Sequence, residues 1–126
     1  MTAPAQRETV DVATLRRMQA AAYSERQLQD EVMELALDLG WKRVHFRPAK
    51  TEHGWRTAVQ GDGEGFPDTL LLRGTRGIAV EMKRQNVTAV PAEQLAWLES
   101  FRITGWTAYV WRPLQLLDGT IARVLT

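Results

Sequence analysis

Two short apolar stretches joined by a tight turn constrain this chain more than any other feature of its sequence. Residues 69–72 and 78–82 are mostly apolar, and Gly74 and Thr75 lie between them. A glycine at the first central position of a two-residue turn is typical of a type II′ β-hairpin. The sequence therefore predicts an antiparallel hairpin whose strands pair symmetrically about this turn.

Three charged side chains lie within these apolar stretches or directly at their ends. In the predicted register Asp68 lies directly opposite Glu81, with Cβ atoms about 4.5–5.5 Å apart, and Lys83 shares their face. Paired carboxylates repel each other, whereas a divalent cation such as Mg²⁺ prefers oxygen ligands and can bind a phosphate beside them. A one-residue slip would move Asp68 to the other face. The alternative interpretation of the three charges is a surface ion-pair cluster at a strand edge.

Two amphipathic helices flank the hairpin in the sequence. Residues 24–40 begin with a capping box of Ser24 and Gln27, continue with an apolar stripe and end at a glycine. Residues 91–105 form a second helical segment, with proline in its first turn and glycine after its end.

Polar residues within these regular elements are candidates for a site. Glu25 lies on the apolar stripe of the first helix, and Gln94 shares a face with Leu98 and Phe101 in the second. A buried polar group without a partner costs about 1–3 kcal/mol, so both positions favour a binding role. The alternatives are that the helix dipole favours Glu25 in a first turn and that Gln94 is solvated. His45, in a predicted strand, is interpreted as a satisfied histidine of the core or rim.

The remaining elements predict an α/β domain. Strands are expected at residues 41–48 and 106–112, with a short final strand at 121–125. The order helix, strand, strand, strand, helix, strand indicates a mixed sheet flanked by helices. With 126 residues, the chain is expected to form an N-terminal arm or short helix over 1–22 and a single domain over 23–126.

Composition excludes several classes of protein. The formal net charge is +1, so any contact with nucleic acid must be local. The chain has no cysteine, which excludes disulfides and thiolate metal sites and fits a reducing compartment. No apolar run approaches the roughly 18 residues of a membrane span, and the first residues lack a secretory signal pattern. We expect a cytoplasmic protein without membrane contact.

Basic and aromatic residues around a long polar loop are candidates for nucleic-acid binding. Lys50, Trp55 and Arg56 lie in the Gly-rich loop over about residues 50–65, and Arg47 and Arg84 can extend a local positive track. A tryptophan among basic residues suits phosphate contact and stacking on an exposed base. The alternatives are that Trp55 merely anchors the loop and that the arginines lie on a solvated face.

Four sequence elements in a defined order resemble a known nuclease family. The pattern resembles the virus-type replication-repair nuclease family (VRR-NUC) of the restriction-endonuclease-like superfamily, with its P-D and E-x-K core, over about residues 24–113. The matching residues are the helix-borne Glu25, then Gly65-Phe66-Pro67-Asp68 as G-x-P-D, then Glu81-Met82-Lys83 as E-x-K, then Gln94 on the following helix.

The resemblance implies metal-dependent hydrolysis of nucleic-acid phosphodiester bonds. Asp68 and Glu81 would hold Mg²⁺ or Mn²⁺, and the backbone carbonyl of Met82 would supply another oxygen. Glu25 would be an acidic ligand, either directly or through water. The implied fold is a restriction-endonuclease-like core in the order αβββαβ.

The same resemblance implies roles for two further residues and a class of substrate. Lys83 would orient or deprotonate the attacking water or stabilise charge on the phosphate, and Gln94 would position water or the phosphate. The substrate would be branched or flapped DNA, in junction resolution, repair or recombination, within a bacterial or phage-infected cytoplasm. Symmetric cleavage of a four-way junction would require a homodimer. The alternatives are a repair or restriction-type nuclease of other preference, and a non-enzymatic DNA-binding or assembly module on the same fold.

Overall fold

A four-stranded mixed sheet forms the centre of the domain. The computed structural model describes residues 11–46, 49–51, 54–56 and 60–126. The elements are α1 (Val12–Ala22), α2 (Glu25–Asp38), β1 (Lys42–His45), β2 (Ala49–Thr51), β3 (Gly54–Arg56), β4 (Thr69–Arg73), β5 (Arg76–Met82), α3 (Ala92–Ile103), β6 (Thr107–Trp111), α4 (Pro113–Leu117) and α5 (Thr120–Leu125). The sheet has the order β1-β4-β5-β6, and β2 and β3 form a separate two-stranded sheet.

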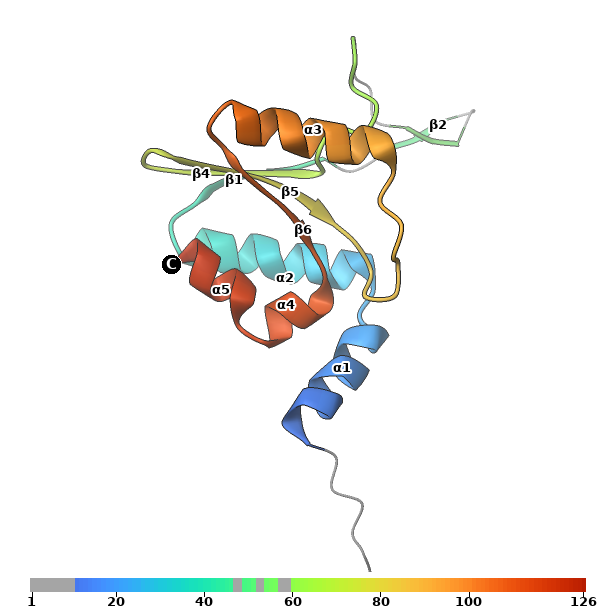
Figure 1. Ribbon diagram of the computed structural model, residues 1–126, viewed down its shortest axis with the longest axis vertical. Coiled ribbons are helices and arrows are strands. Elements are labelled where there is room, and N and C mark those ends of the chain that lie inside the picture. The colour runs from blue at the N-terminus through green and yellow to red at the C-terminus, as the bar shows by residue number, and fades with distance from the viewer. Residues whose placement is uncertain (1–10, 47–48, 52–53, 57–59) are drawn as a thin grey trace, which may run out of the picture.

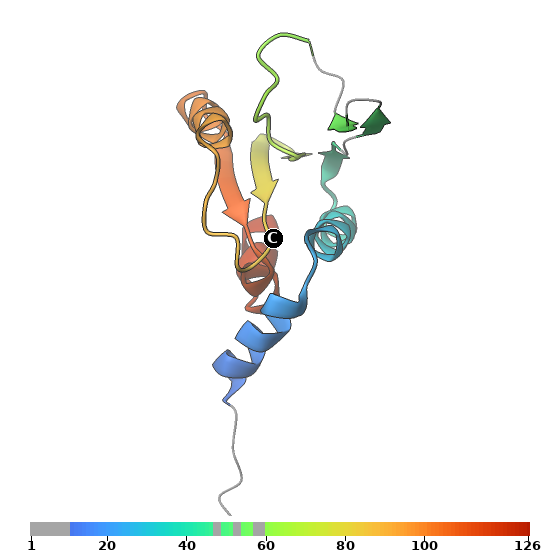
Figure 2. The same cartoon turned by 90° about the vertical axis from the view of Figure 1, so that its right-hand side faces the viewer.

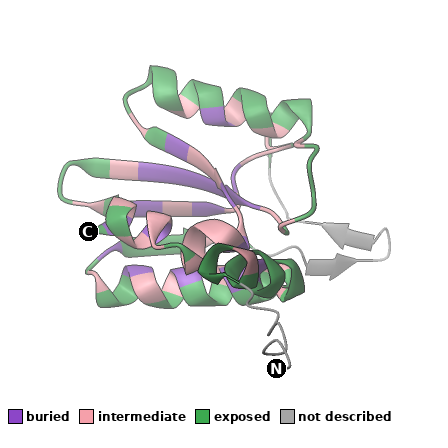
Figure 3. Cartoon of the chain, turned by 60° about the horizontal axis from the view of Figure 1, so that its bottom comes forward, coloured by how far each residue is buried: buried purple, intermediate pink, exposed green. Residues whose placement is uncertain are grey.

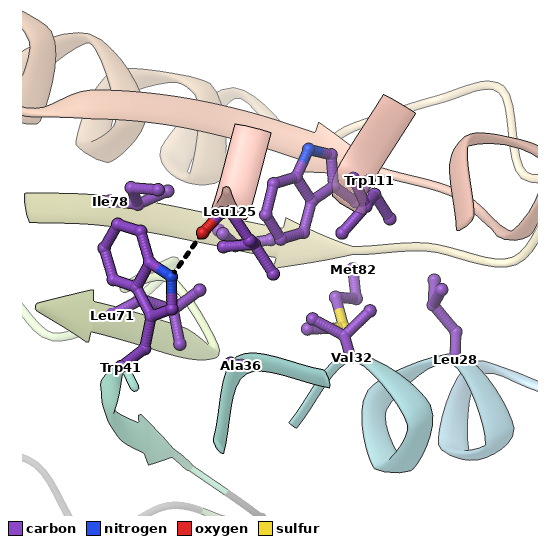
Figure 4. Close-up of a cluster of buried hydrophobic side chains, with 11 residues drawn as sticks. Leu28, Val32, Ala36, Trp41, Leu71, Ile78, Met82, Trp111 and Leu125 are labelled. Carbon is purple, nitrogen blue, oxygen red and sulfur yellow. Dashed lines mark hydrogen bonds between the residues drawn. The ribbon is translucent and has the colours of Figure 1, made fainter. Parts of the chain in front are cut away.

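Helices cover both faces of the sheet (Figures 1 and 2). On one face Leu98 of α3 packs against Ala79 and Ala108. On the other face α2, α4 and α5 enclose a larger core, and Figure 3 shows that burial is concentrated in the central strands. This larger core, shown in Figure 4, consists of Leu28, Val32, Ala36, Trp41, Leu71, Ile78, Val80, Met82, Trp111, Ile121 and Leu125.

The start of α2 is set by the predicted capping box. The Ser24 hydroxyl oxygen accepts the Gln27 N–H at 3.0 Å, and Gln27 Oε1 accepts the Ser24 N–H at 2.8 Å. These bonds satisfy donors that the helix itself leaves unpaired. Leu28, Val32 and Ala36 then recur at four-residue intervals and are all buried. The predicted helix is confirmed, and its apolar face covers the sheet.

The β4–β5 hairpin has the predicted register. Gly74 has φ 58°, the positive value that a type II′ turn requires at this position. Leu71 pairs with Ile78, and Arg73 with Arg76. Because β1–β4 and β4–β5 are antiparallel while β5–β6 is parallel, the sheet is mixed. The predicted α/β, restriction-endonuclease-like order of elements is confirmed.

The C-terminal segment is helical, so the prediction of a strand over residues 121–125 is wrong. Ile121 and Leu125 are four residues apart, and both are fully buried in the larger core. Residues four apart lie on one face of a helix, so α5 buries both side chains together. Arg73 donates to the Leu125 carbonyl at 2.9 Å and Arg76 donates to the Val124 carbonyl, which satisfies carbonyls at the end of α5.

The structure defines two further segments that the sequence left open. The N-terminal region forms α1, capped by Asp11, whose Oδ1 accepts the Thr14 N–H at 2.7 Å, and α1 contacts α4. Residues 1–10 lie outside the described part of the chain. The predicted polar loop contains the short antiparallel pair β2–β3. None of the helices in the described residues has the length and apolar character needed to cross a lipid bilayer.

Candidate active site

The predicted acidic pair lies where β4 begins and β5 ends. Thr69 pairs with Val80, so the same register places Asp68, one residue before β4, opposite Glu81 in β5. Lys83 follows directly after β5, and its N–H donates to the Trp111 carbonyl at 3.0 Å. The N-terminal ends of α2 and α3 lie on this same side of the domain (Figure 1).

Both oxygens of the Asp68 carboxylate are held by neighbouring donors. Oδ1 accepts the Thr69 hydroxyl at 2.8 Å, and Oδ2 accepts the Met82 N–H at 3.0 Å. The Asp68 carbonyl also accepts the Phe46 N–H at 2.7 Å, which extends the pairing of β1 with β4 by one residue. The carboxylate is therefore held by donors from β4 and β5, and the Asp68 backbone is held by the residue that follows β1.

Glu81 is a buried acid with incomplete pairing. Its Oε1 lies 3.8 Å from Lys83 Nζ, and the two side chains are only 7% and 15% exposed, respectively. Its Oε2 is buried and has no hydrogen-bond partner among the described residues. An unpaired oxygen of this kind is costly to bury, so the site fits a ligand that binds oxygen.

Burial raises the pKa values of both acids. The pKa of Asp68 rises to about 6, because burial and the Glu25 charge outweigh its hydrogen bonds with Met82 and Thr69 and the attraction of Lys83. The pKa of Glu81 rises to about 8, chiefly through burial and then through repulsion by Asp68, with Lys83 acting in the opposite direction. The two carboxylates therefore resist being ionised at the same time. A divalent cation bound between them would offset their mutual repulsion and favour the ionised forms.

The donor set fits a hard divalent cation. Asp68 and Glu81 offer carboxylate oxygens, and Mg²⁺ and Mn²⁺ favour oxygen ligands while retaining several waters. In an antiparallel pair the N–H and C=O of one residue point toward the same strand, so the Met82 carbonyl lies on the Asp68 side of β5. The unpaired Glu81 Oε2 is the observation that favours such an ion.

Glu25 lies close to the acidic pair without completing it. It is the first residue of α2 and is half-buried, and its charge raises the pKa of both Asp68 and Glu81. Within the described residues, no group of three or more acidic or histidine side chains is arranged to hold a metal ion. Of the two predicted roles for Glu25, a contact through water fits this arrangement better than direct ligation.

Gln94 and the G-x-P-D segment meet at the start of α3. The Gln94 side chain is half-buried, and its Oε1 is buried without a hydrogen-bond partner among the described residues. Gly65 has φ 80°, and a Cβ at this position would lie 2.6 Å from the Glu93 backbone carbon and 2.8 Å from the Gln94 nitrogen. Only glycine permits this approach of the loop to the helix.

Aromatic contacts hold the same loop in place. Phe66 packs edge-on against Phe46, Trp97 and Phe101, with ring centroids 5.7, 5.0 and 5.9 Å apart. Trp97 Nε1 donates to the carbonyls of Asp62 and Glu64, both at 3.1 Å. The loop that delivers Asp68 to the site is therefore anchored on α3.

We expect Gly65→Ala to destabilise the protein by about 2–4 kcal/mol, because it combines positive-φ strain with overlap against α3. Gly61→Ala is the matched control, since Gly61 has φ 87° but a Cβ there would meet nothing within 4 Å. It should cost only the backbone strain, about 1–2 kcal/mol. Urea unfolding of both variants provides the measurement. Equal losses in the two would contradict a role for the loop–helix contact.

The structure describes only some of the residues that are predicted to contact nucleic acid. Arg84 is exposed and directly follows Lys83, beside the acidic pair. Arg47 lies outside the described residues. Lys50 falls in β2, and Trp55 and Arg56 fall in β3, but their side chains lie outside what the structure describes. The nucleic-acid contacts of all five residues stay predictions.

Two residues near Asp68 were not singled out for the site from the sequence. Thr69 is fully buried and bonds to Asp68, and His45 Nδ1 lies 3.0 Å from Thr69 Oγ1. The interpretation of His45 as a satisfied histidine agrees with this contact. A polar residue at an inward-facing strand position beside the P-D pair was the available signal.

Comparisons with known proteins support the same assignment. No protein-family model matches the chain. No curated protein sequence matches it either. A solved structure described as "VRR_NUC domain" superposes with a TM-score of 0.54 and 26% sequence identity, covering 78% of this chain and 94% of that one. The mixed sheet and this structural likeness show a restriction-endonuclease-like α/β fold, and the ordered motifs and the likeness together support an assignment to the VRR-NUC family.

Proposed function

We propose that this protein is a metal-dependent nuclease that hydrolyses phosphodiester bonds in DNA. The observation that carries the proposal is the pair of half-buried Asp68 and buried Glu81, which lies beside Lys83 at the paired ends of β4 and β5. The likeness to a VRR_NUC domain supports a nuclease. An acidic pair that faces only one lysine contributes little to stability by itself, because the cost of removing charged groups from water can exceed the gain from their attraction.

Asp68, Glu81 and the Met82 carbonyl would hold Mg²⁺ or Mn²⁺, with Glu25 acting through water. When bound, such an ion supplies Lewis acidity that lowers the pKa of a coordinated water and offsets charge on the phosphate. Asp68 is already fixed by hydrogen bonds from Thr69 and Met82, so it would bind with little reorganisation.

Lys83 and Gln94 would act on the water and the phosphate. Lys83 Nζ lies on the Glu81 side of the site, where it would orient the attacking water, accept its proton or offset charge on the phosphate. The buried, unpaired Gln94 Oε1 would accept a hydrogen bond from that water. Arg84, Arg47, Lys50 and Arg56 would contact the DNA backbone, and Trp55 would stack on a base.

For the substrate, we propose branched or flapped DNA. Glu81 is the only buried acid among the described residues, so each chain offers one such site and the two symmetric cuts of a four-way junction would need two chains. A homodimer acting in junction resolution during repair or recombination, in a bacterial or phage-infected cytoplasm, follows from this proposal. A repair or restriction-type nuclease would instead prefer linear duplex.

The test is cleavage of end-labelled four-way junction, flap, duplex and single-stranded DNA with Mg²⁺, Mn²⁺ or EDTA. We expect cutting that requires the metal and is strongest on branched substrates. Lys83→Met should still bind Mn²⁺ but cut at least about 10²-fold more slowly. Lys42→Met is the control, because Lys42 is exposed at the far end of β1, where it pairs with Leu72.

Other results would point elsewhere. DNA binding without cleavage in any metal would favour the non-enzymatic DNA-binding or assembly module. Cleavage in EDTA at an undiminished rate would contradict the role assigned to Asp68 and Glu81.

A further inference from the structure

A buried hydroxyl and a histidine lie behind the Asp68 carboxylate, and neither belongs to the family motifs. Thr69 is fully buried; its hydroxyl donates to Asp68 Oδ1 at 2.8 Å and lies 3.0 Å from His45 Nδ1. We propose that Thr69 and His45 are positioning residues that hold the Asp68 carboxylate in the orientation that binds the divalent cation. This inference rests on the proposed function.

The hydrogen bonds to Asp68 leave room for a cation. Oδ1 accepts one bond from Thr69 and Oδ2 accepts one from the Met82 N–H. Each carboxylate oxygen has two acceptor sites, so each keeps one for a metal ion. Because the two donors come from β4 and β5, they fix the rotation of the carboxylate plane as well as its position.

The direction of the hydroxyl depends on His45. A hydroxyl has one hydrogen, and with Asp68 ionised that hydrogen is donated to Oδ1. The short contact with His45 then requires the Nδ1–H to donate to Thr69 Oγ1. Pairing of β1 with β4 places His45 directly opposite Thr69, so the fold itself supplies this donor.

Partners of this kind are known to matter for metal affinity in general. Groups that hydrogen-bond a ligating carboxylate orient it, and their loss typically weakens metal binding about 10–100-fold. Thr69 is the one of the two Asp68 donors that a side-chain substitution can remove, because the Met82 donor is a backbone N–H. The hydroxyl can therefore be tested alone.

The experiment measures Mn²⁺ affinity by the electron paramagnetic resonance of free Mn²⁺, together with cleavage by the same preparations. Thr69→Val, which keeps the shape and removes the hydroxyl, should raise the Mn²⁺ Kd about 10–100-fold. Thr69→Ser should restore affinity to near the wild-type value. His45→Leu should also weaken binding, while His45→Asn, which keeps an N–H donor near the Nδ1 position, should weaken it less.

Thr107→Val is the matched control. Thr107 lies in β6, is exposed, and its hydroxyl bonds to the Gly77 carbonyl at the far end of β5 from Glu81. Its Mn²⁺ affinity should equal that of the wild type. Unfolding curves of every variant would show that the compared proteins are folded, and the His45 variants provide the test if Thr69→Val does not fold.

The outcomes separate this inference from the proposed function. Wild-type protein that binds Mn²⁺ and cuts DNA, with Thr69→Val binding equally tightly, would overturn the positioning role alone. Failure of Thr69→Ser to restore affinity would overturn it as well. Wild-type protein that neither binds Mn²⁺ nor cuts DNA would overturn the proposed function and the inference together.

Discussion

Asp68→Asn is expected to leave a folded protein that cuts DNA at least about 10²–10³-fold more slowly than the wild type, because it removes a charge that would hold the proposed metal ion. The asparagine fits the same hydrogen bonds. Its oxygen can accept the Met82 N–H while its amide donates to Thr69 Oγ1, which turns its own hydrogen to His45 Nδ1. Mn²⁺ affinity should fall in parallel with the rate.

The control for this variant is Asp118→Asn. Asp118 is exposed between α4 and α5, and its Oδ1 accepts the Thr120 N–H at 2.9 Å, a bond that asparagine also makes. Its rate should equal that of the wild type. Initial rates on the preferred labelled substrate at saturating Mg²⁺ provide the measurement. If Asp68→Asn cut DNA at the wild-type rate, the proposed role of Asp68 in the active site would be contradicted.

The metal-free protein is expected to lose stability as the pH rises from about 4 to about 8. The pKa of Asp68 rises from 3.8 to about 6 on folding, and that of Glu81 from 4.5 to about 8. Between these limits the native state retains protons that the unfolded chain releases, so the free energy of unfolding falls with rising pH. Since one pKa unit corresponds to about 1.4 kcal/mol, the two raised pKa values together allow a loss of at most about 8 kcal/mol across this range.

Urea unfolding in EDTA at pH 5 and pH 8, followed by tryptophan fluorescence, measures this loss. Asp68→Asn should reduce the difference between the two pH values, because it removes one of the two acids and the repulsion between them. Mg²⁺ should restore stability at pH 8, since it binds only the ionised pair of the native state. An unfolding free energy that is constant between pH 5 and pH 8 would contradict the raised pKa values.

Two other acids with shifted pKa values, Asp11 and Asp118, do not change the stability of the protein within this pH range. Hydrogen bonds with the backbone and side chain of Thr14 lower the pKa of Asp11, and those with Thr120 lower the pKa of Asp118. Groups with lowered pKa values stabilise the native state above their unfolded pKa and lose this effect only on acidification. Their contribution therefore changes below about pH 4, outside the measured interval.

Much of the fold followed from local sequence signals. The turn glycine Gly74 predicts the hairpin and its register, and Ser24 with Gln27 predicts the start of α2; the structure confirms each. These signals succeed because a tight turn or a helix cap involves atoms only a few residues apart. The opposition of Asp68 and Glu81 follows directly from the turn.

Other parts of the molecule required contacts between distant segments. Residues 121–125 suggested a strand by composition, but they form α5, which buries Ile121 and Leu125 in the larger core. The contact of Gly65 with α3 and the bonding of His45 to Thr69 each join residues 24 or more positions apart. No local pattern encodes such distances.

The sequence by itself thus determined the hairpin, the two amphipathic helices, the ordered acidic and lysine motif and the expected class of chemistry. Only the tertiary structure decided how deeply Asp68 and Glu81 are buried, which donors hold Asp68, and that Glu81 Oε2 and Gln94 Oε1 are left unpaired. The physical reason is that turns, caps and periodicity are set by neighbouring residues. Desolvation, close backbone approach and side-chain hydrogen bonds are set by what the folded chain packs together.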